Sequence, residues 1–197
     1  MAKRIFDIIF SILGIIILSP FFAIISIIIL LTSAGGAFYR QIRVGKNSKE
    51  FKLLKFRTMK VGSDKDLRIT VGNRDSRITG IGFYLRKYKL DELPQLFNVL
   101  VGDMSFVGPR PEVPEYVALY DAEQKTVLSV KPGITDYASI VYSEENELLA
   151  NAENPHELYV KKVMPAKLKL NLRYINEMGL TTDVKVILKT LGKIFKH

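Results

Sequence analysis

The chain has 197 residues, a length that suits one modest globular domain plus a membrane segment. It contains no cysteine, which excludes disulfides and cysteine-ligated metal centres, and its two histidines argue against a Ser–His–Asp triad or a multi-histidine metal site. The formal net charge of +9 suits nucleic acid, anionic lipid or a phosphorylated substrate, but no nucleic-acid-binding motif is present, so we expect no nucleic acid partner.

An apolar segment over residues 5–31 predicts membrane insertion, with only Asp7, Ser11, Ser19 and Ser26 as polar members. A straight helix of this length would measure about 40 Å, more than the roughly 30 Å needed to cross the hydrocarbon core. Pro20 lacks an N–H group and predicts a kink, where the Ser19 hydroxyl can bond to a carbonyl that the proline leaves free. Ser19 and Pro20 therefore mark the predicted break in a membrane helix.

Basic residues flank this segment on both sides, which bears on its topology. Lys3 and Arg4 precede it, and four more follow within 20 residues: Arg40, Arg43, Lys46 and Lys49. Because positive residues favour the cytoplasmic side, both ends are expected there. A re-entrant helix that breaks at Ser19 and Pro20 satisfies this bias; a kinked transmembrane helix and a cleaved signal peptide remain alternatives. We expect a membrane anchor over residues 1–34 and a cytoplasmic domain over residues 35–197.

The first half of that domain is predicted to mix strands and helices. Residues 37–60 predict a basic β-hairpin with its turn near Gly45, which is either solvated on anionic lipid or a wall that attracts phosphate. Residues 63–80 are polar and predict a loop. Two helical segments are expected to meet near Lys89 and Leu90, with Asp91 as the N-cap of the second.

The second half predicts a helix over 114–127, a turn and a strand over 130–142, an acidic stretch and then a basic helix. In the tail, apolar residues of 184–195 recur at helical spacing, with Lys185, Lys189, Lys193 and Lys196 on other faces. The tail thus predicts a basic amphipathic helix that either lies at a membrane interface or covers the core. The predicted fold class is α+β: a re-entrant membrane helix, a small β-hairpin and several helices, including interfacial amphipathic ones.

Adjacent acids in the stretch "LDELPQ" are the main candidates for chemistry. Asp91 and Glu92 are placed near a helix N-terminus, which favours ionised carboxylates. Arg86 precedes them and Arg110 follows in "GPRP". Two carboxylates between arginines suit a magnesium–diphosphate substrate, because Mg²⁺ takes carboxylate and phosphate oxygens and arginine binds phosphate bidentately. The alternative is that both acids only cap a helix.

Five stretches of the sequence carry a family resemblance, and together they cover most of the chain. They are "KRIFD" (3–7), the Ser19–Pro20 break, "FKLLKFRTM" (51–59), "LRKYKLDELPQLFNVLVGDMSFVGPRP" (85–111) and "KPGIT" (131–135). In these stretches the chain resembles the bacterial monotopic phosphoglycosyl transferases, which begin the assembly of capsule, lipopolysaccharide and other glycoconjugates. Its length resembles the minimal form of that family, which contains only the catalytic domain.

The resemblance implies a specific reaction at the cytoplasmic face of the bacterial inner membrane. A UDP-sugar gives its phosphosugar to polyprenol phosphate, commonly undecaprenyl phosphate, and UMP is released through a covalent aspartyl-phosphosugar intermediate. By position, Asp91 is the implied nucleophile, and Glu92 with Asp91 is implied to hold Mg²⁺. Arg86 and Arg110 match arginines of the family motifs and are expected to contact phosphate.

The chain departs from the family pattern after "KPGIT". Many relatives continue with Gly-Trp and a "Q-V-N-G-R" type run, whereas this chain reads "DYASIVYSEENELL" (136–149) and contains no tryptophan. Asp136, Tyr137 and Glu144 are candidates for sugar specificity, with an ordinary strand and loop as the alternative. The sugar and any homodimer are left open. A non-catalytic membrane scaffold, or a conventional glycosyltransferase that releases UDP, are the competing functions.

Overall fold

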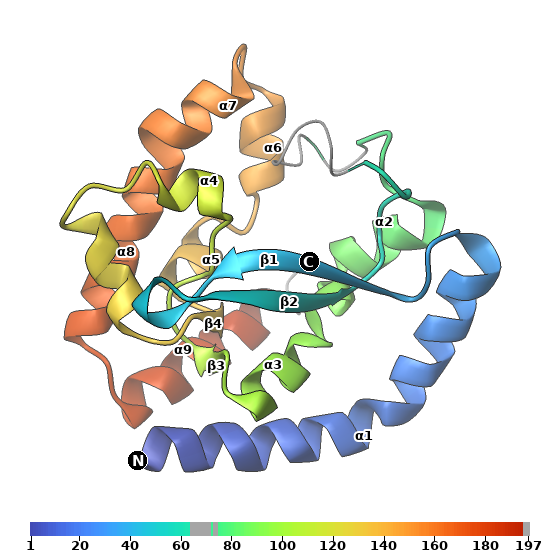
Figure 1. Ribbon diagram of the computed structural model, residues 1–197, viewed down its shortest axis with the longest axis horizontal. Helices are drawn as coiled ribbons and strands as arrows, with labels where there is room; N and C mark the ends of the chain where they lie inside the picture. Colours follow the sequence, from blue (N-terminus) through green and yellow to red (C-terminus); the bar gives the residue numbers. More distant parts are fainter. Residues whose placement is uncertain (64–71, 73–74, 195–197) are drawn as a thin grey trace.

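The computed structural model describes residues 1–63, 72 and 75–194. Its first element is the long helix α1 (Ala2–Thr32), which contains Pro20 and is bent midway along its length (Figure 1). The Ser19 hydroxyl donates to the Ile16 carbonyl at 2.8 Å, the acceptor that the missing N–H of Pro20 leaves free. The predicted break is therefore a bend within one continuous helix rather than an interruption.

Both arms of α1 contact the same folded body. In the N-terminal arm, Arg4 donates to the Val99 and Leu100 carbonyls at 2.6 and 2.8 Å, and Asp7 accepts from the backbone N–H of Phe106 at 3.1 Å. The C-terminal arm packs through apolar side chains: Ile29 is fully buried, and the rings of Phe22 and Phe56 meet edge to face at 5.7 Å.

The predicted hairpin follows α1. Strands β1 (Phe38–Val44) and β2 (Glu50–Phe56) pair antiparallel, from Phe38 opposite Phe56 to Val44 opposite Glu50. The 3₁₀ turn η1 (Lys46–Ser48) joins them, with Asn47 and Ser48 in the left-handed region. Most of the loop predicted over 63–80 lies outside the described residues.

The segment around "LDELPQ" follows as α2 (Gly80–Lys87), the 3₁₀ turn η2 (Leu90–Glu92) and α3 (Gln95–Val101). The predicted hinge is confirmed, because Lys89 has a φ of 56°. The prediction that Asp91 is an N-cap is wrong: Asp91 lies inside η2, and α3 begins only after Pro94. Leu90 and Leu93 pack against the core that α1 shares with α2, α3 and β2, and this packing turns the backbone before the helix starts.

Two distant motifs are joined by the parallel strands β3 (Ser105–Val107) and β4 (Gly133–Thr135). "GPRP" follows β3 and "KPGIT" contains β4. A Cβ on Gly133 would overlap the Gly108 backbone, so only glycine permits this close approach.

The structure corrects two predicted elements between 114 and 142. The predicted helix over 114–127 is instead α4 (Pro114–Val117) and a later 3₁₀ stretch, η3 (Gln124–Ser129). Asp121 interrupts it, because its carboxylate accepts the Gln124 N–H at 2.8 Å. The strand predicted over 130–142 ends at Thr135, and α5 (Tyr137–Val141) follows.

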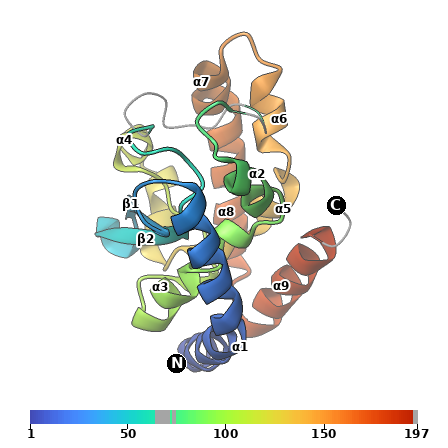
Figure 2. The same ribbon diagram turned by 90° about the vertical axis from the view of Figure 1, so that its right-hand side faces the viewer.

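The remaining elements are helical. Their order is α6 (Glu145–Ala150), α7 (Pro155–Leu158), the π-helical turn η4 (Tyr159–Val163), α8 (Met164–Asn176) and α9 (Leu180–Ile194). In Figure 2, α6 and α7 lie at the end of the molecule away from the N-terminus of α1, whereas α9 starts close to it. The mixed helix and strand content confirms the predicted α+β class.

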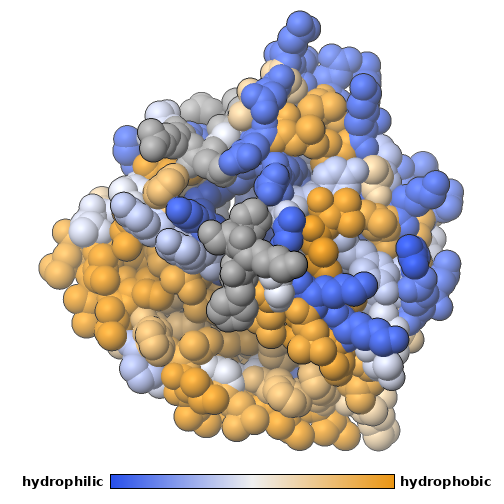
Figure 3. Space-filling view, turned by 180° about the vertical axis from the view of Figure 1, so that it is seen from behind, coloured by the Kyte–Doolittle hydropathy of each residue, from blue (hydrophilic) through white to orange (hydrophobic). Residues whose placement is uncertain are grey.

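The surface is divided between apolar and polar regions. Figure 3 shows hydrophobic side chains gathered over the lower and left part of the molecule, around α1, and hydrophilic ones above. Helix α1 is long and apolar enough to cross a membrane. The predicted tail helix is confirmed as α9, in which Val186 is buried while Val184, Leu188 and Leu191 remain exposed. Phe195 and Lys196 of that prediction lie outside the described residues.

Candidate active site

Glu92 is held by cations from two directions. Its side chain is 16% exposed, and its Oε1 lies 2.8 Å from Lys55 Nζ on β2. The Arg110 guanidinium, which follows β3, binds both carboxylate oxygens, with Nη1 3.2 Å from Oε2. Glu92 therefore links the hairpin to the "GPRP" segment through a bidentate ion pair.

Asp91 lies beside Glu92 but in a different environment. It is 6% exposed. Its carboxylate forms no hydrogen bond or close ion pair with any residue that the structure describes. The nearby charges of Lys55, Arg86 and Lys89 act on it only at longer range. One acid is thus committed to structure, while its neighbour is left available.

The two carboxyl groups titrate in opposite directions. Burial, followed by the negative charge of Glu92, raises the pKa of Asp91 above its ordinary value, against the opposing effect of Lys55. Burial also acts to raise the pKa of Glu92, but Arg110 and Lys55 outweigh it and hold that pKa well below its usual range. The expectation that a helix N-terminus keeps both acids ionised therefore fails for Asp91, because burial dominates there.

Arg110 is positioned by the residue that follows "KPGIT". Asp136 is fully buried, and its Oδ2 accepts the Arg110 backbone N–H at 3.3 Å. Its Oδ1 accepts the Ser139 N–H at 2.6 Å and caps α5. Asp136 thus supports the arginine that binds Glu92, which the prediction of a sugar-specificity role did not anticipate.

A cavity of about 240 Å³ opens beside Asp91. Among the described residues that line it, eight are Lys or Arg and three are Asp or Glu. The basic ones include both predicted arginines and come from the hairpin, the segment between β2 and α2, α2 itself, the segment after β3 and α8: Arg43, Lys55, Arg57, Lys60, Arg77, Arg86, Arg110 and Lys167. This excess of positive charge suits a diphosphate.

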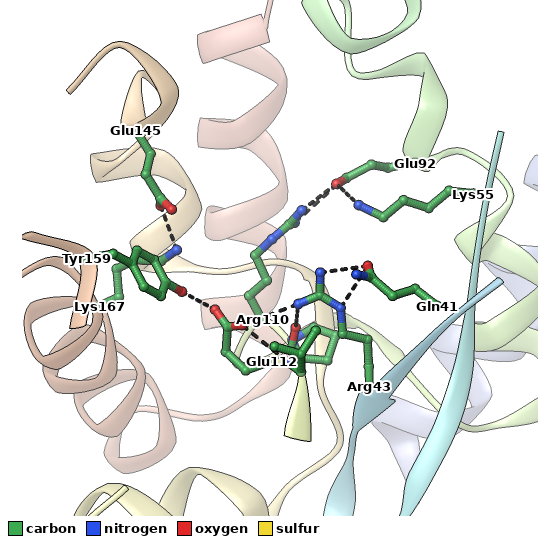
Figure 4. Close-up of polar contacts among 11 residues, drawn as sticks. Gln41, Arg43, Lys55, Glu92, Arg110, Glu112, Glu145, Tyr159 and Lys167 are labelled. Atoms are coloured by element: carbon green, nitrogen blue, oxygen red, sulfur yellow. Dashed lines mark hydrogen bonds and ion pairs between the residues drawn. The ribbon is translucent and has the colours of Figure 1, made fainter. Parts of the chain in front are cut away.

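A second polar network forms another wall of the cavity (Figure 4). The Arg43 guanidinium donates to the Gln41 side chain at 2.8 Å and to the Pro111 carbonyl at 2.9 Å. Arg43 also pairs with Glu112 at 3.3 Å, and Glu112 accepts the Tyr159 hydroxyl. Beyond Tyr159, Lys167 of α8 pairs with Glu145 of α6 at 2.6 Å.

The acidic side chains of the site bear on Mg²⁺ binding, which the family resemblance implies. No group of three or more acidic, histidine or cysteine side chains gathers within the described part of the chain, so a cage made only of protein ligands is not formed there. The Asp91 carboxylate is uncommitted, and the contacts of Glu92 use three of its roughly four acceptor positions. The residues therefore fit a magnesium ion whose remaining ligands come from substrate phosphate and water.

The site residues predicted from the sequence fall into two groups. Asp91, Glu92, Arg86 and Arg110 gather at or beside the cavity. Two of the specificity candidates do not: the Tyr137 hydroxyl donates to Glu177 at the surface, and Glu144 is exposed.

The structure adds Lys55, which the sequence analysis did not single out. Lys55 and the buried Leu53 lie two residues apart on β2, so their side chains point to the same face. This two-residue spacing from an apolar residue was the sequence signal that could have marked Lys55 as facing inward.

Comparisons with known proteins agree with the family resemblance found in the sequence. The bacterial sugar transferase family matches residues 1–197. The chain is 33% identical to the exopolysaccharide production protein ExoY of Sinorhizobium fredii, covering 98% of this chain and 85% of that protein. It is 34% identical to the UDP-N-acetylgalactosamine-undecaprenyl-phosphate N-acetylgalactosaminephosphotransferase of Aeromonas hydrophila, over 98% of this chain and 43% of that one.

A third relative is the UDP-glucose:undecaprenyl-phosphate glucose-1-phosphate transferase of Klebsiella pneumoniae, at 36% identity over 98% of this chain and 40% of that one. The chain thus spans less than half the length of these two larger relatives. The match over the full chain and the transferase names of these relatives make it an enzyme of the transferase class. The chain belongs to the bacterial sugar transferase family.

Proposed function

We propose that this enzyme transfers a sugar 1-phosphate from a UDP-sugar to undecaprenyl phosphate, with release of UMP, and so begins the assembly of a glycoconjugate such as exopolysaccharide, capsule or lipopolysaccharide. The observation that carries the proposal is the buried Asp91 carboxylate, which has no hydrogen-bond partner in the described part of the chain and lies beside a cavity rich in cations. The names of the relatives supply the substrate classes.

Asp91 is the nucleophile in this proposal. Its carboxylate attacks the phosphorus that carries the sugar, and the bond from that phosphorus to the bridging oxygen of the diphosphate breaks. UMP leaves with the electron pair, and an aspartyl phosphosugar remains. A phosphate oxygen of undecaprenyl phosphate then attacks the same phosphorus and displaces Asp91. The raised pKa of Asp91 favours this role, because a more basic carboxylate is the stronger nucleophile once it is ionised.

The neighbouring groups hold charge and position. Glu92 with Asp91 would hold Mg²⁺ together with the donor phosphates, and that ion would offset the negative charge that Asp91 approaches. Arg86 and Arg110 bind phosphate oxygens in this scheme, and Lys55 keeps Glu92 ionised and oriented.

The anchor is proposed to be re-entrant, with residues 1–34 dipping into the inner leaflet and residues 35–197 on the cytoplasmic face. Both arms of α1 pack against one folded body, and a helix that crossed the bilayer would separate them. The exposed apolar side chains around the bend, such as Ile16, Ile17 and Phe21, would then face lipid. In this proposed arrangement, Asp91 would lie where a lipid-borne phosphate and a soluble donor can both reach it.

Asp91→Asn tests the chemistry. The full chain in lipid is supplied with UDP-sugars and undecaprenyl phosphate, and UMP and lipid product are measured. We expect a loss of at least about 10⁴-fold in turnover, as for other nucleophiles, whereas Glu157→Gln, in an exposed ion pair, keeps wild-type turnover. Mass spectrometry of the wild-type enzyme with donor alone should detect a phosphosugar on Asp91. Absence of that adduct under conditions of turnover rejects the mechanism, and release of UDP indicates a conventional glycosyltransferase.

Single cysteines test the anchor, because the chain contains none of its own. Cysteines are placed at Ala2 and at Ser33, the two ends of α1. Both should react with an impermeant maleimide in inverted vesicles, whose cytoplasmic face points outward, and neither should react in right-side-out vesicles. Labelling from opposite sides would establish a spanning helix. Pro20→Ala is expected to shift the labelling toward that spanning pattern, because it restores the N–H that the bend lacks.

A further inference from the structure

The end of the cavity formed by α6 and α8 differs from the cationic part beside Asp91. Glu145, Asn146 and Lys167 line it, with Tyr159 beneath them. We propose that Glu145, Asn146 and Lys167 form a subsite for the hydroxyl groups of a carbohydrate ring of the donor. This inference rests on the proposed function.

The Glu145–Lys167 pair is a fixed pair of hydrogen-bonding groups. The Glu145 and Lys167 side chains are 23% and 12% exposed, and Glu145 Oε2 lies 2.6 Å from Lys167 Nζ. Lys167 also lies over the Tyr159 ring at 5.5 Å, and the Tyr159 hydroxyl is bound by Glu112. A carboxylate accepts from a hydroxyl group and an ammonium donates to one, so the pair can bind adjacent hydroxyls without moving.

Asn146 adds groups that are not used within the fold. Its side-chain amide has no hydrogen-bond partner among the residues that the structure describes, although it is partly buried in the cavity wall. Its backbone is held, because the Asn146 carbonyl accepts the Gly72 N–H at 3.1 Å. A free amide on a fixed backbone can both donate to and accept from a hydroxyl or acetamido group.

Charge argues for hydroxyl groups rather than phosphate at this end. Glu145 would repel a phosphate, and Lys167 is already neutralised by it. The other seven Lys and Arg residues that line the cavity come from outside α6 and α8, and Arg86 and Lys55 among them act on the charge of Asp91. A donor whose diphosphate lies beside Asp91 would therefore present one of its two carbohydrate rings, the sugar or the ribose, to Glu145 and Asn146.

Two variants test the subsite in the full chain: Glu145→Gln and Asn146→Ala. The second removes a side-chain amide that makes no hydrogen bond within the described residues, so it is expected to leave the fold intact. The value of kcat/KM is measured for UDP-glucose, UDP-galactose and their N-acetylated forms, and the ratios between these donors are compared. The inhibition constant of UMP is measured for the same variants. We expect the preferred donor to lose about tenfold of its advantage in Glu145→Gln, since a lost hydrogen bond to a charged group has about that effect, and about fivefold in Asn146→Ala, where the lost hydrogen bond is to a neutral amide. Glu157→Gln should keep the wild-type ratios.

The UMP constant identifies the ring. An unchanged constant with altered donor ratios assigns the subsite to the sugar, and a constant weakened as much as the donor KM assigns it to the ribose. Donor ratios and UMP constants within about twofold of wild type in both variants would overturn the subsite. If the wild-type enzyme transfers no sugar, the proposed function fails, and the subsite is then judged by calorimetric binding of the same nucleotides: weaker binding to both variants supports it, and unchanged binding rejects it.

Discussion

Two buried polar clusters in this protein draw on one common segment of the chain but differ in how completely their groups are paired. The anchor cluster joins α1 to α8, α9 and β3, and consists of Lys3, Asp7, Ser105, Tyr174 and Asp183. The site cluster consists of Lys55, Asp91, Glu92 and Arg110. A single short segment contributes to both, because Ser105 and Arg110 are only five residues apart.

Every charged group of the anchor cluster has a hydrogen-bond or ion-pair partner within the fold. Asp183, 1% exposed, binds Lys3 and accepts the Tyr174 hydroxyl at 2.6 Å. Lys3 also donates to the Val107 carbonyl at 3.0 Å, and Asp7 accepts from Ser105 at 3.1 Å. Such a satisfied network holds elements together and leaves nothing free for a ligand.

The site cluster lacks that completeness at one residue. Glu92 is bound by Lys55 and Arg110, but Asp91 keeps its carboxylate unpaired among the described residues at 6% exposure. An unpaired buried carboxylate is unfavourable for folding and useful for chemistry, because its pKa is shifted and its oxygens are available. The contrast separates a cluster that is fully paired within the fold from the candidate functional one, without reference to any relative.

Asp183→Ala should have the largest effect on stability. Removing this carboxylate leaves Lys3 and Tyr174 without their main acceptor, and breaking a buried pair costs about 3–5 kcal/mol. We expect the lower end, about 3 kcal/mol, because the Lys3 side chain is 28% exposed. The unfolding temperature in detergent measures it, with Glu157→Gln as the exposed control. A loss no greater than the control's would mean that the anchor cluster does not hold α1 to the body.

Glu92→Gln should follow, with an effect on both stability and turnover. The amide keeps one acceptor but no charge, so the hydrogen bonds from Lys55 and Arg110 weaken toward those of a neutral acceptor, and we expect a total loss of about 2 kcal/mol. Denaturant unfolding and UMP release would both decline. Wild-type stability in this variant would contradict the interpretation that Glu92 is committed to structure.

Gly133→Ala should disturb both clusters at once. A Cβ at this position overlaps the Gly108 backbone, and overpacking of this kind costs roughly 1–3 kcal/mol. Gly80→Ala is the matched control, because nothing lies within 4 Å of an added Cβ there. Thermal unfolding should show a loss of stability only for Gly133→Ala. Equal stability of the two variants would show that the paired strands β3 and β4 can move apart without cost.

Asp91→Asn should have the smallest effect on stability, and of the opposite sign. The pKa of Asp91 is raised in the folded state, so its contribution to stability is present below the unfolded pKa and is lost as the pH rises through the folded pKa. The free energy of unfolding of the variant should therefore equal that of wild type under acidic conditions and exceed it by up to about 1 kcal/mol at neutral pH.

The measurement for Asp91→Asn is the unfolding temperature as a function of pH. Glu92 has the opposite sign: its pKa is lowered, so its contribution is present above the unfolded pKa and is lost as the pH falls through the folded one. A stability gap between Asp91→Asn and wild type that narrows as the pH rises would contradict the assigned direction.

Local patterns determined much of the architecture and most of the site inventory. The apolar run with Ser19 and Pro20 predicted a bent helix, because a proline removes an N–H whatever surrounds it. Alternation and a glycine turn predicted the hairpin, and the "DELPQ" and "GPRP" motifs marked Asp91, Glu92 and Arg110. These features depend on covalent geometry, short periodicities and residue chemistry, all of which are present in the chain before it folds.

Only the tertiary structure decided how the two acids divide their roles. Asp91 and Glu92 are neighbours with nearly the same chemistry, yet Lys55 from β2 and Arg110 from beyond β3 both reach Glu92. The same holds for Asp136, which supports Arg110 instead of lining the cavity, and for Glu145, which lines it in place of Glu144. Partners that arrive from distant segments, and the burial that accompanies them, set a carboxylate's pKa and its availability, and no local pattern encodes which partner arrives.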